Sequence, residues 1–553
     1  MQKKTLLIGV DGFTWNVVNP LIEKGLLPNI KHLIESGVFG QLYTLENLKS
    51  PVIWTSIATG RDKYEHKIED FVMRVEGKYT NIPVNSEMRK VKAFWNILSE
   101  NKKKNITLGW YASYPAEKVD GIVISDRIFE TEKNSCYPDS YLKYLKEFFN
   151  EDDMNTSLKE LVNGDENFDI FPGAMIKGGF FRDLIFEKYF LKFLDEEDFD
   201  VMAVMLLGSD PIQHYFWKYW EPEKFDEDIS KVKLDKYKDT IPRYYIHIDN
   251  FLGKVLKKAP LDKYNIIMVS DHGFKEWNVN RYWYHLNLLL LDLGYLYYQK
   301  PKNYTKYILK RFIKRNLFFL YKLYKSFKHQ PIESDSKNIF EKYKDKEIDW
   351  EKTIFYDKSF NPELSLRHIA LNLKGREESG IVPPEKTKFY MKKLMKKLEP
   401  LKTDNSRDLF VFVRKAGQQY VEVAVKMNAS TEIICDNITI NRKTYPVSRY
   451  YEKIPISGHH KIEGFAIYAG EDFKQNYLSN NLSVLDVTPL LLVLNDLPIA
   501  RNMKGKVRKF WFDTPPEIKF IDTYETEKRE TKIIDKDSDE DVRKKLRALG
   551  YIS

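Results

Sequence analysis

Three apolar, strand-like runs of the sequence lead into acidic residues. They are residues 6–10 before Asp11, residues 201–207 before Asp210 and residues 266–269 before Asp271. Two of these acids have a histidine nearby: His214 lies four residues after Asp210, and His272 directly follows Asp271. Carboxylate and imidazole groups are ligands for divalent cations such as Zn²⁺. If a helix begins at Asp210, one helical turn separates Asp210 from His214, so this pair is placed to bind one ion.

The three runs have the length and the continuous apolarity that are typical of buried strands in a parallel sheet. In such α/β sheets, ligands bind beyond the carboxyl ends of the strands. We therefore expect the three acids to meet at one edge, although they are far apart in the sequence. Residues 106–110, 121–125 and 464–468 are further candidate strands of this sheet, and the spacing of apolar residues predicts helices around residues 141–150 and 184–194.

Two more segments carry candidate chemistry. Ser50 precedes Pro51, which predicts Ser50 as the N-cap of a helix with Pro51 at its first position. Free amides and the positive end of that helix would then stabilise a Ser50 alkoxide and an incoming phosphate. In the segment 458–464, either His459 or His460 is a candidate metal ligand. Each feature alone is typical of ordinary caps and loops, but their joint occurrence favours a metal site.

Composition narrows the class of protein. With 553 residues, of which 43% are hydrophobic, the chain predicts a large globular catalytic domain with insertions. The apolar start is too short for a signal peptide, and no later run has the ~18 uncharged apolar residues of a membrane span. Cys136 and Cys435 are far apart and suit a reducing compartment. We expect a cytoplasmic protein whose net charge of +9 favours anionic ligands, without specific nucleic-acid binding.

The expected organisation alternates core and inserted segments. It consists of a catalytic core (1–130, 199–298 and 451–514), a helical insertion (131–198), a basic, mixed insertion or cap (299–450), and a charged C-terminal tail (515–553) with a short helix over 542–551. Residues 300–328 lack acidic residues and alternate basic with apolar ones. This segment is either a helical lobe with a solvated face or a surface for peripheral contact with an anionic membrane or polymer.

The order of these motifs resembles the alkaline phosphatase superfamily, in its type I phosphodiesterase and nucleotide pyrophosphatase branch. The resemblance extends over Lys4 to Phe71, Ala93 to Arg127, Asp200 to Leu296 and Ser457 to Lys506. Supporting positions are Gly40, Thr59-Gly60 with His66, residues 114–117, 210–217 and 287–296, and Leu497-Pro498-Ile499-Ala500. It implies an α/β fold with a mostly parallel central sheet flanked by helices and an inserted cap or lobe.

The resemblance also implies a two-metal site, usually occupied by zinc, with Mn²⁺ compatible with the same ligands. Asp11, Asp271 and His272 would bind the ion that also contacts the nucleophile. Asp210, His214 and His460 would bind the other ion, with His460 preferred to His459 because the family has this histidine four residues before a glycine. The nucleophile would be Ser50, with Thr55 as the alternative.

The implied function is hydrolysis of a phosphate ester by a phosphodiesterase or nucleotide pyrophosphatase, through a covalent seryl intermediate. The alternatives are phosphate transfer to lipid or glycan head groups, and a non-catalytic, metal-stabilised protein that binds anionic surfaces. Sulfatases and cofactor-independent phosphoglycerate mutases are related alternatives, but Ser50-Pro51-Val52 lacks the sulfatase pattern and the context of the acids favours phosphodiesterases. An asparagine of the related enzymes is missing, and Asp70 in that stretch disfavours a dianionic phosphate unless it is protonated or turned away. The substrate-binding residues stay unassigned.

Overall fold

The computed structural model describes residues 3–46, 48–74, 78–79, 81–164, 173–278, 281–299, 348–359, 366–416, 422–428 and 430–526. The chain forms two compact units. Unit 1 comprises Met1–Met73, Asn81–Val279 and Pro455–Ile552, and unit 2 comprises Arg74–Thr80 and Asn280–Ile454. The basic segment 300–328 and the expected helix over 542–551 lie outside the described residues.

A ten-stranded sheet forms the centre of unit 1, in the order β21-β2-β20-β9-β1-β8-β5-β6-β7, with β22 beside β2. Its strands are β1 (Lys4–Val10), β2 (Gly37–Tyr43), β5 (Asn105–Leu108), β6 (Gly121–Ile124), β7 (Cys136–Tyr137), β8 (Val201–Leu206), β9 (Tyr264–Val269), β20 (Glu463–Ala469), β21 (Tyr477–Leu478) and β22 (Leu482–Ser483). The five strands from β9 to β6 run parallel, while β20 is antiparallel to both β9 and β2. The predicted fold class is confirmed.

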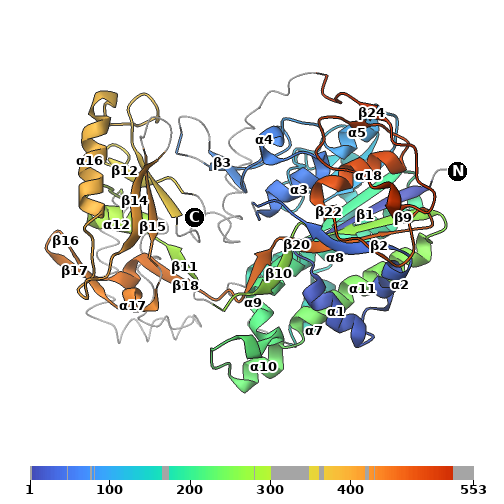
Figure 1. The fold of residues 1–553 in the computed structure, drawn as a ribbon, viewed down its shortest axis with the longest axis horizontal. Coiled ribbons are helices and arrows are strands. Elements are labelled where there is room, and N and C mark those ends of the chain that lie inside the picture. Colours follow the sequence, from blue (N-terminus) through green and yellow to red (C-terminus); the bar gives the residue numbers. More distant parts are fainter. Residues whose placement is uncertain are drawn as a thin grey trace. The chain divides into compact units, whose positions relative to one another are not determined.

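Helices cover both faces of this sheet (Figure 1). One layer contains α1 (Trp15–Glu23), α2 (Pro28–Glu35), α7 (Glu151–Leu161), α8 (Gly173–Glu196), α9 (Ser209–Trp220) and α11 (Thr240–Lys258). The other contains α3 (Ser50–Thr59), α5 (Phe94–Glu100) and α18 (Val487–Leu494). Along β1, Leu6 and Ile8 pack with the first layer and Leu7 with the second. This strand is buried on both faces, which explains its continuous apolar sequence.

The register of the central strands brings their carboxyl ends to one edge. Val10 is paired with Leu206 of β8, and Gly9 with Val269 of β9. The backbone N–H of Asp11 continues this pattern by donating to the carbonyl of Leu206 at 2.9 Å. The acids that follow the three strands therefore leave the sheet at the same end, as predicted.

The helical segments that were expected as an insertion belong to unit 1. Residues 141–150 form a 3₁₀ turn (Asp139–Leu142) and α6 (Lys143–Phe148), and residues 184–194 lie within α8. Residues 515–526 of the expected tail include β24 (Phe520–Ile521), which pairs with β23 (Ile499–Ala500). Among the described residues, no helix combines the length and the apolarity that crossing a membrane requires.

Unit 2 has a hydrophobic core of its own. Its four-stranded antiparallel sheet has the order β12 (Phe355–Asp357), β13 (Leu366–Leu371), β15 (Glu422–Met427) and β14 (Phe410–Ala416). Helices α12 (Leu286–Asp292) and α16 (Thr387–Leu398) contribute apolar side chains to this core. Smaller antiparallel pairs join β11 (Arg281–Tyr284) to β18 (Tyr451–Ile454) and β16 (Asn437–Ile440) to β17 (Lys443–Pro446).

A close contact between β1 and α3 gives a test of this packing. A Cβ atom on Gly9 would lie 2.6 Å from two ring carbons of the buried Trp54. We expect Gly9→Ala to lower the free energy of unfolding by about 1–3 kcal/mol, because the ring must move within a filled core. Chemical denaturation of the purified protein measures the change.

Gly179→Ala is the matched control, because its new Cβ would have ordinary contacts, the nearest at 3.5 Å. Alanine is the better helix former, so this change in α8 is expected to leave stability equal or raised by up to ~1 kcal/mol. Equal stability of the two variants would show that Trp54 does not pack against Gly9 as described.

Candidate functional site

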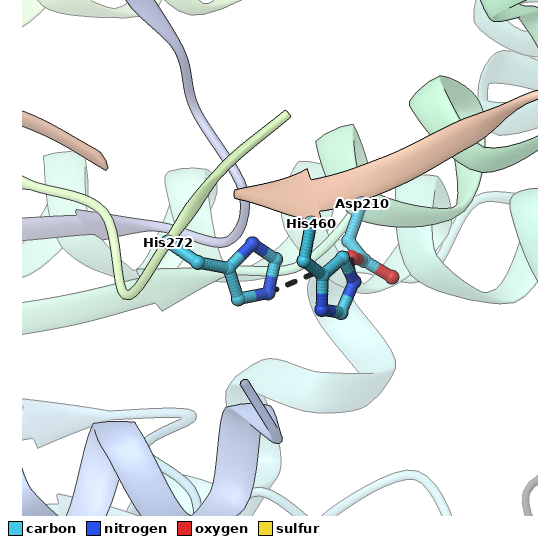
Figure 2. Close-up of side chains that lie close together, drawn as sticks. All are labelled: Asp210, His272 and His460. Carbon is cyan, nitrogen blue, oxygen red and sulfur yellow. Dashed lines mark hydrogen bonds and ion pairs between the residues drawn. The ribbon is translucent and has the colours of Figure 1, made fainter. Parts of the chain in front are cut away.

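The residues predicted as metal ligands lie together in unit 1, beyond the carboxyl edge of the sheet. Two groups of ligand atoms each lie within 4.8 Å of one another: Asp11, Asp271 and His272 form one group, and Asp210, His272 and His460 the other. Figure 2 shows the second group, in which the rings of His272 and His460 stack with centroids 3.6 Å apart. His272 belongs to both groups, and its Nε2 lies 3.5 Å from Asp11 Oδ1 and 3.9 Å from Asp210 Oδ1.

His214 also converges on this region. Its Nε2 atom lies 2.9 Å from His460 Nε2 and 3.5 Å from Asp210 Oδ1. His460 Nε2 in turn lies 3.0 Å from the same Asp210 oxygen. His214 Nε2, His460 Nε2 and Asp210 Oδ1 thus lie around one point, and each can accept a hydrogen bond or bind a metal ion. Their lone pairs repel one another unless a proton or a cation lies between them. The pairing of Asp210 with His214, expected from their spacing, is present at the start of α9.

Backbone carbonyls orient all three imidazoles. His214 Nδ1 faces the carbonyl of Gly458 at 2.9 Å, His460 Nδ1 faces that of Leu48 at 2.9 Å, and His272 Nδ1 faces that of Gly273 at 3.2 Å. A carbonyl only accepts, so each Nδ1 carries the hydrogen. Each Nε2 is thereby turned toward the acids, which is the arrangement that metal-binding histidines usually have.

The charges in this cluster shift one another. Burial, followed by the charges of Asp271 and Asp210, raises the pKa of Asp11 well above its usual range. Burial raises the pKa of Asp271 to about 7, although the N–H of Gly12 donates to it at 3.0 Å. Burial also lowers the pKa of His272. Carboxylates gathered in this way need positive charge nearby to stay ionised.

The pKa of Asp210, the partly exposed acid of the cluster, shifts in the opposite direction. Burial acts to raise the pKa of Asp210, but the neighbouring imidazoles of His214 and His460 outweigh it and lower the pKa below its usual range. Asp210 in turn outweighs the effect of burial on His460 and raises the pKa of that imidazole. The neighbouring histidines therefore stabilise the ionised form of Asp210, whereas the negative charge of Asp271 destabilises the ionised form of Asp11.

Ser50 lies beside the acids, at the N-terminus of α3. Its Oγ donates to Asp11 Oδ1 at 3.3 Å. The prediction that Ser50 is the N-cap is wrong by one residue, because the carbonyl of Lys49 accepts the first helical bonds, from Val52 and Ile53, and Lys49 is the cap. The Ser50 hydroxyl is turned toward Asp11.

The alternative nucleophile, Thr55, is one turn further along α3. Its Oγ1 donates to the carbonyl of Pro51 at 2.6 Å and is buried. A hydroxyl bonded within its own helix is less free to reach a substrate. The geometry therefore favours Ser50 over Thr55.

The choice between the two neighbouring histidines follows from strand geometry. Residues 458–461, expected as a loop, form β19 (Gly458–Lys461), which is antiparallel to β10 (Gly273–Glu276). Consecutive residues of a strand point to opposite faces. His460 points to the acids, while His459 packs against Trp277 with ring centroids 4.2 Å apart. His460 is the residue placed in the cluster.

Several residues that position the cluster were not foreseen. Trp54 Nε1 donates to Asp11 Oδ2 at 3.1 Å, the Ser209 hydroxyl donates to the carbonyl of Asp11, and Gln213 Nε2 donates to that of Gly12 at 2.9 Å. Trp54 is four residues after Ser50, so one face of α3 presents both side chains. That spacing was the one signal for Trp54 in the sequence. Ser209 and Gln213 had a weaker signal in the sequence, namely their closeness to Asp210 and His214 in the same helix.

Asp183 of α8 fixes the loop that leads to Asp210. Its carboxylate is buried and accepts the N–H groups of Leu207 and Gly208, both at 2.7 Å, and the hydroxyl of Tyr244 at 2.7 Å. Burial raises the pKa of Asp183 to about 6, and these donors act against that rise. The turn between β8 and α9 is therefore set by a side chain from another helix.

The family described as type I phosphodiesterase / nucleotide pyrophosphatase matches residues 5–462, and the chain belongs to this family. Its membership supports a phosphoesterase. A search of curated proteins by sequence finds no match.

A comparison with solved structures finds similarity to two ectonucleotide pyrophosphatase/phosphodiesterase 5 proteins. The human protein is 12% identical, with a TM-score of 0.44, and the alignment covers 91% of this chain and 97% of that chain. The murine protein, solved in an inactive form in complex with AMP, has the same identity, TM-score and coverage.

The role of Asp183 is testable by stability. We expect Asp183→Ala to lower the free energy of unfolding by ~3 kcal/mol, because the N–H groups of Leu207 and Gly208 and the buried Tyr244 hydroxyl lose their acceptor. Asp195→Ala, at an exposed ion pair with Lys258, should change stability by less than ~0.5 kcal/mol. A loss at Asp183 no larger than that at Asp195 would mean that the carboxylate does not fix this turn.

Proposed function

We propose that the chain is a two-metal phosphodiesterase in which Ser50 forms a covalent intermediate with the phosphoryl group. Asp11, Asp271 and His272 would hold one divalent cation, and Asp210, His214 and His460 the other. The observation that supports this most directly is the position of Ser50: its hydroxyl contacts Asp11, one of the ligands, from the N-terminus of α3.

The residues fit divalent cations. Asp271 Oδ2 and His272 Nε2 are buried, lie 3.3 Å apart and have no hydrogen-bond partner among the described residues. Buried polar atoms normally have a partner, so a pair of this kind is typical of a site that binds an ion. Carboxylate oxygens with imidazole nitrogens suit Zn²⁺, and Mn²⁺ is compatible. The arrangement supports two cations of this class.

The chain's own groups define the first step. Ser50 Oγ attacks phosphorus, its proton leaves toward the Asp11 carboxylate, and the bond from phosphorus to the leaving oxygen breaks. The leaving oxygen takes a proton from water. Divalent cations bound here would polarise the phosphoryl oxygens and favour the ionised form of the Ser50 hydroxyl. The N-terminal amides of α3 add positive potential at the same place.

The second step restores the enzyme. Water attacks the phosphoryl group on Ser50 and releases one proton to solvent, the bond from phosphorus to Oγ breaks, and Oγ regains the proton that Asp11 took in the first step. An alcohol in place of water would give transfer instead of hydrolysis. Hydrolysis is proposed because the family is one of phosphodiesterases and pyrophosphatases.

Replacement of the nucleophile is the primary test. We expect Ser50→Ala to lower kcat/KM for bis-p-nitrophenyl phosphate by ~10³-fold or more, because the covalent step is lost. Thr55→Val should lower it by less than ~10-fold, since the Thr55 hydroxyl donates to the carbonyl of Pro51 within its own helix. Initial rates of p-nitrophenol release measure both.

Two outcomes would contradict the proposal. Equal activity of Ser50→Ala and wild type would exclude Ser50 as the nucleophile. Absence of activity toward every tested ester, with two cations bound, would favour the non-catalytic binding protein.

The two neighbouring histidines give a matched test of metal binding. We expect His460→Ala to reduce zinc content from about two ions per chain to about one, because an imidazole ligand is lost. His459→Ala should keep about two ions, since its ring packs on Trp277. Elemental analysis of dialysed protein measures the content, and a loss in His459→Ala alone would reverse the ligand assignment.

A further inference from the structure

An ion pair stands next to Ser50. Lys49 directly precedes Ser50, and its Nζ pairs with Asp70 Oδ2. The two side chains are 23% and 24% exposed, so the pair is neither buried in the core nor free in solvent. The other carboxylate oxygen of Asp70 accepts the N–H of Phe71 at 2.8 Å, which fixes its direction.

The loop that carries Asp70 is held by the same helix that carries Ser50. His66 Nε2 lies 3.0 Å from the Ser56 hydroxyl of α3, and His66 Nδ1 accepts the N–H of Ile68 at 3.1 Å. His66 and Ser56 are fully buried. Helix α3 therefore carries Ser50 and also holds the start of the segment that leads to Asp70.

This geometry determines the charge that an incoming phosphoryl group meets. An unpaired ammonium next to the nucleophile would attract the second negative charge of a phosphomonoester. Asp70 neutralises that ammonium and adds a fixed negative charge. A phosphodiester carries a single negative charge, so the Asp70 carboxylate repels it less than it repels a doubly charged phosphomonoester. The edge-to-face pair of Phe71 and Tyr111, with centroids 6.4 Å apart, adds partly exposed aromatic surface near Asp70, where a second ester group would pack.

We propose that the Lys49–Asp70 pair is a specificity determinant that favours singly charged phosphodiesters over doubly charged phosphomonoesters at Ser50. This inference rests on the proposed function, since it takes Ser50 as the point of attack. Asp70 acts by holding Lys49 and by repelling a second charge. It takes no part in bond making.

The test compares wild type, Asp70→Asn and the matched control Glu69→Gln, as full-length, zinc-loaded proteins. Asparagine keeps an oxygen for the N–H of Phe71 but removes the charge, and Glu69 is an exposed acid one residue away. The ratio of kcat/KM for p-nitrophenyl phosphate to that for bis-p-nitrophenyl phosphate should rise about tenfold in Asp70→Asn. Glu69→Gln should leave this ratio within about twofold. Lys49→Met, which removes the cation and keeps Asp70, should lower the ratio.

A binding measurement separates this inference from the proposed function. Calorimetry at pH 8 compares inorganic phosphate, mainly a dianion there, with the monoanion dimethyl phosphate, and needs no turnover. Asp70→Asn should tighten phosphate binding about tenfold relative to dimethyl phosphate. If wild type hydrolyses neither ester but the binding ratio still shifts, the proposed function fails and the role of the pair stands. Two outcomes would overturn the inference when hydrolysis occurs. In the first, Asp70→Asn changes neither the kcat/KM ratio nor the binding ratio. In the second, Glu69→Gln changes both ratios as much as Asp70→Asn does.

Discussion

Repulsion among clustered carboxylates is the constraint on which the site depends. Asp11 and Asp271 are buried, Asp210 is close by, and the pKa values of Asp11 and Asp271 are raised. In a medium of low dielectric constant, such groups are stable as anions only with positive charge between them. The imidazoles supply lone pairs at the same place, because backbone carbonyls hold the hydrogen of each ring on the opposite nitrogen. The proposed pair of divalent cations would satisfy both sets of groups.

The scaffold meets this constraint with few elements. Strand β1 lies between β8 and β9, so the acid that follows it is central to the group. Helix α3 packs its Trp54 on Gly9 of β1, donates from that ring to Asp11 and presents Ser50 one turn away. A single contact between helix and strand thereby aligns the Ser50 hydroxyl with the Asp11 carboxylate. The antiparallel pair of β10 and β19 then brings His460 to the same edge.

Much of this could be predicted from the sequence, because it depends on local patterns. Continuous apolar runs identified β1, β8 and β9, and the general behaviour of parallel sheets placed the following acids together. Strand β2 was missed, since Gly37 and Gly40 interrupt its apolar pattern. The strand β19 was read as a loop because Gly458-His459-His460-Lys461 has neither apolar character nor β-branched residues.

Contacts between distant segments could not be predicted in this way. The carboxylate of Asp183 holds the turn before Asp210 from another helix, and the Lys49–Asp70 pair joins residues across α3 and the following loop. The apolar periodicity of the sequence does not identify such partners, because they depend on how the helices, strands and loops pack against one another. The N-cap lies at Lys49 because that residue has extended backbone and its carbonyl accepts the first helical bonds, which the spacing of Ser50 and Pro51 does not determine. The cytoplasmic location and the role of residues 300–328 stay predictions.

The most direct test of two cations at this edge of the sheet is anomalous diffraction at the zinc absorption edge, from crystals of the zinc-loaded protein. We expect two peaks per chain, one among Asp11, Asp271 and His272 and one among Asp210, His214 and His460. A single peak, or peaks away from these six residues with the site well ordered, would contradict it.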